Sequence, residues 1–273
     1  MAFLELQGLE KHFPVKEGVF FKKQINTVKA VDGIDLEIEK GEILGLVGES
    51  GCGKSTLSRT IMQLIPASAG SVVLDGVRLS ELSRDQVRQH RIDFQMIFQD
   101  PYASLNPRMT VSSTLAEAIR TRHPSLGGES LDARVAELMR TVGLDPSFMK
   151  KYPHEFSGGQ RQRIAIARAL APEPKLIIAD EPVSALDVSI QSQILNLLKK
   201  LVRELDLTMI FISHDLSVVH YIADRIAVMY FGKIVEFGEA NALMADPQHE
   251  YTRQLLAAVP KISQDLRQAA VPR

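Results

Sequence analysis

Apolar residues in this chain form three short, nearly continuous runs. They read ILGLV at 43–47, LIIAD at 176–180 and TMIFIS at 208–213. Runs of this length that do not alternate with polar residues are typical of strands buried on both faces of a parallel sheet. Because helical segments lie between them, the pattern predicts an α/β protein with a parallel sheet at its core.

Apolar residues elsewhere recur at the spacing of one helix face. This pattern predicts helices over 56–65, 164–171 and 189–205, and a helical tail over 241–260. The charged segment 81–93 is also predicted to be helical. Between about 105 and 155, short helical patterns are broken by Pro and Gly, which indicates a helical insertion into the α/β core.

The first 47 residues are predicted to be rich in strands. Apolar and polar residues alternate over 4–10, 27–33 and 34–42, with glycines at the breaks. The basic, aromatic-bearing stretch 15–26 is interpreted as a solvated loop between two of these strands. A further strand is predicted after the turn at 66–70, and a hairpin is predicted over 226–238.

Bulk composition is that of an ordinary globular protein. The chain has 273 residues, of which 45% are hydrophobic and 24% charged, with a formal net charge of −1. This balance argues against a dedicated nucleic-acid binder, which carries a basic surplus. A single cysteine, Cys52, rules out a disulfide within the chain and fits a reducing cytosol. We find neither a signal-peptide core at the start nor about 18 uninterrupted apolar residues anywhere.

The segment GESGCGKST matches the phosphate-binding pattern G-x-x-x-x-G-K-[S/T]. A predicted buried strand precedes it and a predicted helix follows it, which is the context that distinguishes a phosphate loop from a plain glycine-rich turn. Backbone N–H groups and the helix N-terminus would surround a phosphate. Within it, Lys54 would reach the β- and γ-phosphates, and the Ser55 hydroxyl would bind Mg²⁺. The predicted nucleotide-binding residues here are Gly48, Glu49, Ser50, Gly51, Cys52, Gly53, Lys54, Ser55 and Thr56.

One carboxylate ends the apolar run LIIAD, and a second carboxylate directly follows it. Asp180 is predicted to hold Mg²⁺, and Glu181 to polarise an attacking water. Alone, these residues would be a strand end entering an acidic turn. With a phosphate loop upstream, a catalytic interpretation is favoured.

A second candidate anion site is FSGGQ, which opens the helix predicted over 164–171. Ser157, Gly158, Gly159 and Gln160 are of the types found where helices begin and bind anions. In isolation the segment could be a simple helix cap. Two phosphate-binding helix starts in one chain suggest one nucleotide contacted by two copies of the fold.

As a set and in this order, GESGCGKST, IFQDP, FSGGQ, LIIADEP, SALD and FISHD resemble the ATP-binding cassette of ABC transporters. The resemblance covers about residues 4–262. It implies a P-loop cassette with a RecA-like core, an N-terminal antiparallel β subdomain and a helical subdomain at about 105–165. The signature motif of the family more often begins with Leu, so Phe156 is a mild departure at a position that packs rather than binds phosphate.

The resemblance assigns four further residues. Phe13 lies at the position of the aromatic residue that stacks on adenine, although it could instead be a core aromatic at a strand end. Gln99 matches the glutamine that reaches Mg²⁺ and the attacking water, and Asp187 matches the loop that crosses between subunits. His214 matches the histidine near the γ-phosphate. Together with Gln99 and Glu181 it completes the implied catalytic set.

The implied assembly is a dimer of cassettes with two ATP molecules between them. One subunit would hold the phosphates and Mg²⁺, while Ser157 and Gly159 of the facing subunit would cap the γ-phosphate. The expected partners are a second ATPase subunit, identical or different, two membrane permeases and, indirectly, an extracytoplasmic substrate-binding protein, with no nucleic acid. The expected location is the cytoplasmic face of the inner membrane.

The tail DPQHEYTRQLLAAVP resembles that of the oligopeptide and dipeptide importer ATPases. It implies a cassette over 1–262, a C-terminal helical extension over 240–273 that core cassettes do not need, and import of peptides. Nickel, glutathione or another small solute is the alternative cargo. An exporter subunit, a DNA-repair or translation ATPase, and a binding module without hydrolysis are less favoured, because the chain lacks membrane spans and basic extensions and has both Glu181 and His214.

Overall fold

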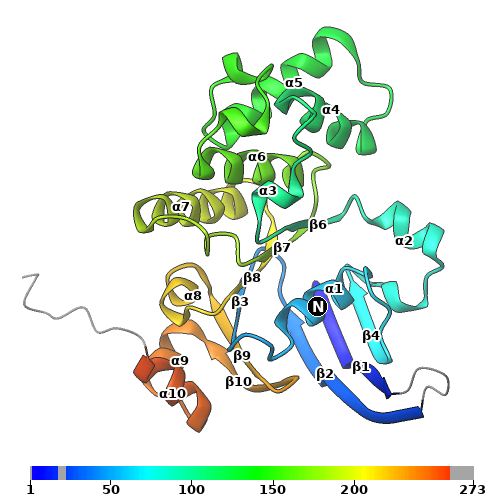
Figure 1. The fold of residues 1–273 in the computed structure, drawn as a ribbon, viewed down its shortest axis with the longest axis vertical. Helices are drawn as coiled ribbons and strands as arrows, with labels where there is room; N and C mark the ends of the chain where they lie inside the picture. Colours follow the sequence, from blue (N-terminus) through cyan, green and yellow to red (C-terminus); the bar gives the residue numbers. More distant parts are fainter. Residues whose placement is uncertain (1, 18–22, 259–273) are drawn as a thin grey trace, which may run out of the picture.

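Two sheets organise the fold, shown in Figure 1 as a computed structural model that describes residues 2–17 and 23–258. The smaller sheet is antiparallel, with the strand order β2-β1-β4-β5. Its strands are β1 (Leu4–Glu17), β2 (Lys23–Ile38), β4 (Ala69–Leu74) and β5 (Val77–Arg78).

The larger sheet has six strands in the order β10-β9-β3-β8-β7-β6. All neighbours pair in parallel except β9 and β10, which form the antiparallel hairpin predicted over 226–238. The strands are β3 (Ile43–Val47), β6 (Phe94–Ile97), β7 (Leu176–Asp180), β8 (Thr208–Ser213), β9 (Arg225–Tyr230) and β10 (Lys233–Glu239).

The apolar runs form the centre of this sheet, as predicted. Every residue of β3, β7 and β8 is buried. Along β3, Ile43 and Val47 pack into one hydrophobic cluster, while Leu44 and Leu46 pack into another on the opposite face. Burial on both faces explains why polar residues do not alternate with apolar ones here.

Helices cover both faces of the large sheet and form a group beyond its β6 edge. In Figure 1 this helical group, residues 101–170, occupies the upper part of the molecule, and the small sheet lies at the lower right. The α-helices are α1 (Lys54–Ile61), α2 (Arg84–His90), α3 (Pro101–Ser104), α4 (Val111–Arg122), α5 (Gly128–Thr141), α6 (Gly158–Leu170), α7 (Val188–Glu204), α8 (Leu216–Ile222), α9 (Ala240–Ala245) and α10 (Glu250–Ala258). The 3-10 helices are η1 (Leu79–Glu81), η2 (Pro146–Phe148) and η3 (Pro153–Glu155).

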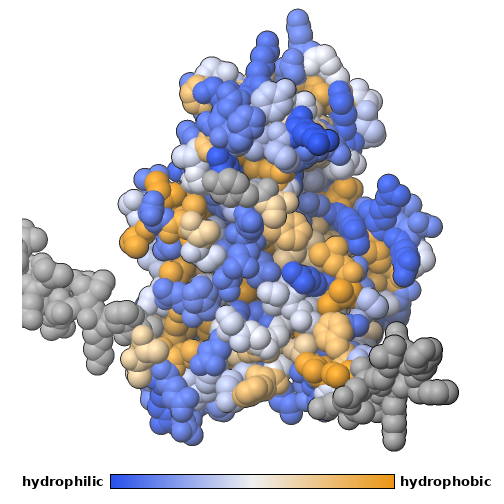
Figure 2. Space-filling model, in the orientation of Figure 1, coloured by the Kyte–Doolittle hydropathy of each residue, from blue (hydrophilic) through white to orange (hydrophobic). Residues whose placement is uncertain are grey.

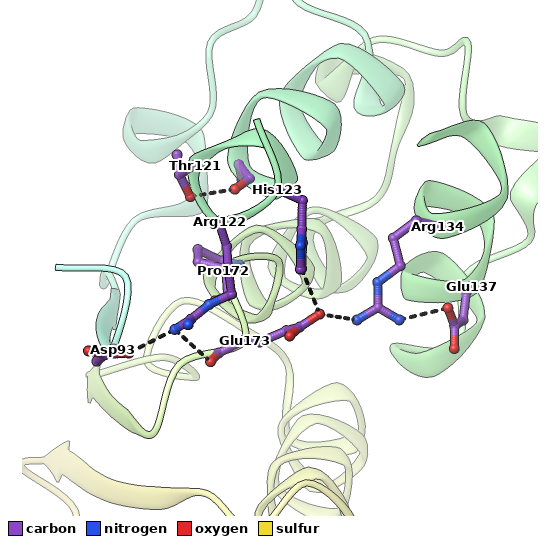
Figure 3. Close-up of polar contacts among 9 residues, drawn as sticks. Asp93, Thr121, Arg122, His123, Arg134, Glu137, Pro172 and Glu173 are labelled. Atoms are coloured by element: carbon purple, nitrogen blue, oxygen red, sulfur yellow. Dashed lines mark hydrogen bonds and ion pairs between the residues drawn. The ribbon is translucent and has the colours of Figure 1, made fainter. Parts of the chain in front are cut away.

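Arg122, at the end of α4, ties the helical group to the edge of the core. Its guanidinium donates to Asp93 Oδ1 at 2.8 Å, just before β6 (Figure 3). It also donates to the backbone carbonyls of Pro172 and Glu173, in the connection from α6 to β7. One side chain therefore joins three segments that are far apart in the sequence.

The Glu173 side chain extends this network toward α5 (Figure 3). Its Oε1 lies 2.6 Å from Arg134 Nη2 and 3.3 Å from His123 Nε2, and Arg134 also pairs with Glu137. Burial works to raise the pKa of Glu173, but the contacts with His123 and Arg134 outweigh it and lower that pKa. These groups are half-exposed, so each pair contributes at most about 1 kcal/mol.

Two expectations about the first half of the chain are corrected, and one strand was not predicted. The predicted loop over 15–26 is too long, because β1 continues to Glu17 and β2 begins at Lys23, with Val15 opposite Asn26. The strands predicted at 27–33 and 34–42 are one strand, β2, because backbone pairing with β1 continues past Gly33. Strand β6 was not anticipated. Residues 18–22 of the predicted loop and 259–273 of the predicted C-terminal extension lie outside the described residues.

Candidate active site

A cavity of about 950 Å³ lies along the edge of the large sheet where β3, β6, β7 and β8 end. The carboxyl ends of parallel strands meet at one edge of a sheet, which is where ligands bind in open α/β folds. Most of the lining residues follow these four strands, and the small sheet supplies the rest. The lining is formed by Phe13, Val28, Ala30, Ser50, Gly51, Gly53, Lys54, Ser55, Thr56, Gln99, Asp100, Glu181, Ser184, Ala185 and His214.

At two positions, the loop between β3 and α1 has a backbone conformation that only glycine accommodates. Gly53 has a φ of 115°, and a Cβ there would lie 2.0 Å from the carbonyl oxygen of Ala30. Gly48 has a φ of 154°, and its Cβ would lie 2.2 Å from the carbonyl oxygen of Met229. Close contact with the neighbouring strands therefore requires glycine at both positions, and the loop turns tightly at the start of α1.

Lys54 is the first residue of α1 and is only 5% exposed. Its Nζ donates to the carbonyl oxygens of Gly48 at 2.6 Å and Glu49 at 2.9 Å. These partners are neutral, so they satisfy the hydrogen bonds without cancelling the charge. A buried cation, a helix N-terminus and no acidic residue in the first turn of α1 combine into a site for an anion.

Three of the predicted loop residues do not line the cavity. Gly48, Glu49 and Cys52 lie behind it, and the Cys52 side chain is 7% exposed and packs in the core between the sheets. Cys52 Sγ lies 3.8 Å from Lys54 Nζ. The thiol faces the core and not the cavity, so Cys52 serves here as a small side chain that fits the packing behind the loop.

Asp180 and Ser55 are brought together although 125 residues separate them. Ser55 Oγ lies 3.4 Å from Asp180 Oδ1, and Asp180 is 7% exposed. Burial raises the pKa of the Asp180 carboxyl, with the nearby Glu181 acting in the same direction. The carboxylate of Asp180 and the hydroxyl of Ser55 are hard oxygen donors, which Mg²⁺ prefers.

Glu181 has a left-handed backbone, with a φ of 47°. This conformation is costly for a residue with a long side chain, by about 1–3 kcal/mol, and such residues cluster at functional sites. The Glu181 amide donates to the carbonyl oxygen of Ile212 at 2.9 Å, which holds the turn against β8. The strained turn directs the Glu181 side chain into the cavity.

Gln99 and His214 both contact the same oxygen of Glu181. Gln99 Nε2 donates to Glu181 Oε2 at 3.2 Å, and His214 Nδ1 lies 3.2 Å from that oxygen. The three residues follow β6, β8 and β7, so the parallel sheet itself assembles them. Such a cluster can orient a carboxylate and hold a water molecule beside it.

Phe13 lies at the opposite side of the cavity, on the small sheet. Its ring is 40% exposed, and Lys11 Nζ lies 5.0 Å from the ring centroid. Val28, on the neighbouring strand, is also exposed and lines the cavity. The alternative of a core aromatic does not fit this exposure.

The FSGGQ residues lie outside this cavity. Ser157 caps α6, where its Oγ accepts from the Gln160 amide and the Gln160 Oε1 accepts from the Ser157 amide. Ser157 is exposed. Asp187 caps α7 without a side-chain hydrogen bond, and it too lies off the cavity lining. Within one chain, the structure therefore separates the predicted nucleotide-binding residues into two sets.

Several lining residues were not singled out from the sequence. Val28 and Ala30 come from β2, Asp100 follows Gln99, and Ser184 and Ala185 belong to the turn that leads to α7. Asp100 lies within the matched segment IFQDP, and Ser184 and Ala185 lie within SALD, so membership of these motifs was an available signal. Val28 and Ala30 carry no such signal, because only the approach of the small sheet brings them to the loop.

Comparison with known proteins gives a consistent result. A model of the ABC transporter family matches residues 31–184. The oligopeptide transport ATP-binding protein OppF of Salmonella typhimurium is 53% identical over 266 residues, covering 97% of this chain and 80% of that protein. The oligopeptide transport ATP-binding protein AppF of Bacillus subtilis is 52% identical over 260 residues, covering 95% and 78%.

Solved structures share both the architecture and part of the sequence. The ATP-binding cassette MJ0796, in a dimeric post-hydrolysis state bound to ADP and Pi, is 30% identical with a TM-score of 0.76, covering 87% of this chain and 98% of its own. CbiO1 of Clostridium perfringens, part of the transporter complex cbiONQ, is 27% identical with a TM-score of 0.78, covering 97% and 99%. The motifs, the cavity and these likenesses agree: the chain belongs to the ABC transporter family as an ATP-binding cassette with the ATPase fold.

Proposed function

We propose that this chain is the ATP-hydrolysing subunit of an importer of di- and oligopeptides. The observation that carries the proposal is the convergence of Lys54, Gln99, Glu181 and His214 on one cavity. The peptide cargo is supported by the 53% identity to an oligopeptide transport ATP-binding protein over 97% of the chain. A cassette of this kind does not itself contact the cargo, so the likeness and not the cavity carries the substrate class.

In this proposal ATP spans the cavity from Phe13 to the start of α1. Phe13 presents an exposed ring for the adenine, for which stacking on a base contributes about 1–3 kcal/mol in nucleic-acid complexes. The phosphates lie against Lys54 and the amides of the loop, from Gly51 to Thr56. The positive end of α1 favours the same position.

The oxygen donors beside the phosphates fit Mg²⁺. Ser55 and Asp180 would hold it, and the amide oxygen of Gln99 is available because Gln99 donates through its nitrogen to Glu181. Bound there, the ion would neutralise charge on the phosphates. The fit rests on the chemistry of the donors, because Asp180 is a buried carboxylate and the Ser55 hydroxyl lies 3.4 Å from its Oδ1.

Hydrolysis requires a water molecule placed in line with the γ-phosphate. Glu181 would accept the proton of that water, since its carboxylate lines the cavity beside the phosphate loop and is held by Gln99 and His214. Gln99 and His214 hold Glu181 Oε2 from two sides and so leave Oε1 for the water. His214 would also donate to the γ-phosphate.

A second cassette would complete the site. Ser157, Gly158, Gly159 and Gln160 lie outside the cavity of their own chain, so we assign them to the ATP of a facing subunit, with Asp187 at the boundary. The solved MJ0796 cassette is a dimer, which supports the assignment. Such a sandwich is favoured only while γ-phosphate bridges both halves, so hydrolysis releases it.

The remaining partners follow from membership of the family. Two membrane permeases and, indirectly, an extracytoplasmic binding protein would complete the transporter, with this chain at the cytoplasmic face of the inner membrane. In the part of the chain that the structure describes, no helix is both long and apolar enough to cross a bilayer. We assign residues 1–262 to the cassette, about 105–165 to a helical subdomain and 240–273 to a C-terminal extension.

The test is ATP hydrolysis by the assembled transporter in lipid vesicles. With its permeases and binding protein present, the complex is expected to hydrolyse ATP faster when di- or oligopeptides are added. Nickel and glutathione are the matched alternative cargoes. Stimulation by either of those, and not by peptides, would overturn the peptide assignment while leaving the ATPase assignment intact.

A further inference from the structure

The last helix that the structure describes, α10, contacts the back of the phosphate loop through one side chain. Tyr251 is 5% exposed, and its hydroxyl oxygen accepts a hydrogen bond from the backbone N–H of Glu49 at 2.8 Å. The two residues are 202 positions apart in the sequence. Tyr251 does not line the cavity, so any effect on nucleotide must act through the loop.

The position of Tyr251 is held from two directions. Its ring packs on Tyr230 at the end of β9, with centroids 4.1 Å apart and an interplanar angle of 34°. Just before α10, the Glu236 carboxylate accepts from the amides of Gln248 at 2.8 Å and His249 at 3.0 Å. The hydroxyl is therefore presented to the loop by a helix anchored to the large sheet.

Glu49 is held on both sides of its α-carbon. Its N–H donates to Tyr251, while its carbonyl oxygen accepts from Lys54 Nζ at 2.9 Å. The next residues, Ser50 and Gly51, line the cavity. The orientation of the Glu49 backbone thus determines where the loop amides point and where the Lys54 ammonium rests before nucleotide arrives.

An uncharged phenol hydroxyl suits the position beside the Glu49 amide. Burial raises the pKa of the Tyr251 hydroxyl, so it keeps its proton and accepts the amide as an uncharged oxygen. A carboxylate in the same place would pair with Lys54 and weaken the site for phosphate. Tyr251 satisfies the buried amide without adding charge.

We propose that Tyr251 is a positioning residue for nucleotide: α10 uses its hydroxyl to hold the phosphate loop in the conformation that receives ATP. This inference rests on the proposed binding of ATP at residues 48–56. A loop that is already ordered loses less conformational freedom on binding, so the tie raises affinity without touching the ligand. The C-terminal extension would then be part of the nucleotide site and not only an appendage.

Tyr251→Phe removes only the hydroxyl and keeps the ring on Tyr230. We expect the Kd for ATP to rise about 3- to 10-fold, the factor that corresponds to one ordinary hydrogen bond, with kcat little changed. The matched control is Tyr230→Phe, which leaves the Glu49 hydrogen bond in place and should leave the Kd unchanged. Thermal unfolding of each variant reports whether the fold is intact.

Amide hydrogen exchange gives a readout that global destabilisation does not mimic. In Tyr251→Phe, exchange is expected to rise in the peptide covering 48–53 and to stay at the wild-type level in β7 and β8. Unchanged Kd and unchanged exchange in a folded Tyr251→Phe protein would overturn the inference. Failure of the wild-type protein itself to bind ATP would instead overturn the proposed function, so the two failures are distinguishable.

Discussion

The chain contains two helix starts to which we assign phosphate, and they differ in what satisfies their backbone amides. At α1, the cap residue is Gly53 with no side-chain hydrogen bond, and a buried lysine stands beside it. At α6, Ser157 and Gln160 form a reciprocal capping box on an exposed surface. The first start has unsatisfied amides and a charge facing a cavity, whereas the second is stable without a ligand.

This difference indicates separate roles for the two helix starts. In the proposed function the α1 start would bind ATP in an isolated chain, because the charge, the amides and the cavity are all present in one subunit. In the same proposal the α6 start would offer the Ser157 hydroxyl proton and nearby amides to a ligand bound by another subunit. The affinity for ATP would come from the α1 start, and dimer-dependent hydrolysis would require the α1 start of one subunit together with the α6 start of the other.

The largest expected effect is on the chemistry between the two starts. Glu181→Gln should lower kcat by about 10²- to 10⁴-fold, because the variant cannot accept the proton of the attacking water. ATP binding should persist, since Lys54 and the loop are untouched. Phosphate release and equilibrium ATP binding measure the two properties separately. Glu204→Gln, at the exposed end of α7, serves as the control; wild-type turnover in Glu181→Gln would exclude Glu181 as the base.

Removing the charge at α1 tests the first half of the comparison. Lys54→Ala should weaken ATP binding by the isolated chain about 10- to 100-fold, the factor expected for a hydrogen bond to a charged group. Binding of a fluorescent ATP analogue measures it. Lys175→Ala, which removes an exposed lysine paired with Asp75, should bind like the wild type. Equal affinities for both variants would contradict the placement of phosphate at α1.

Removing the cap at α6 tests the second half. Ser157→Ala should leave ATP binding by the isolated chain unchanged while lowering ATPase activity of the dimer by about 10-fold, the upper range for one hydrogen bond. The matched control is Ser83→Ala, because Ser83 forms the same capping box with Gln86 at α2. Both variants lose about 1 kcal/mol of helix capping, so stability alone cannot separate them.

If Ser83→Ala and Ser157→Ala reduced the ATPase activity equally, the α6 start would be a structural cap only. Sedimentation of an ATP-bound, hydrolysis-deficient Glu181→Gln background would add a second readout. There, Ser157→Ala should weaken ATP-dependent association and Ser83→Ala should not.

The smallest expected effect concerns how the helical group carrying α6 is held. The pKa of Glu173 is lowered, so its contacts stabilise the folded state above the unfolded pKa, near 4.3, and this contribution is lost as pH falls through the lower folded value. Glu173 is half-exposed, so the loss should be at most about 1 kcal/mol. Urea unfolding of wild type and Glu173→Gln at pH 7 and below pH 4 checks it, and the difference between the two proteins should shrink at acid pH.

Local patterns were sufficient where one segment carries both the element and the chemistry. The run ILGLV and the glycine spacing of the loop predicted β3, the turn and α1, because a strand buried on both faces and a phosphate loop have distinctive sequences. Strand β6 escaped because FQMI is short and lies among charged residues, where no period can be counted. The extent of β1 and β2 escaped because their pairing, and not their composition, continues the ladder past Val15.

By itself, the sequence determined the fold class and the residues of both helix starts. Only the tertiary structure decided which of the predicted site residues share a cavity. The ends of β6, β7 and β8 bring Gln99, Glu181 and His214 together because parallel strands align their carboxyl ends, whatever the distance along the chain. The contact between Tyr251 and Glu49 likewise depends on docking α10 against the sheet, and no local pattern encodes a hydrogen bond between such distant residues.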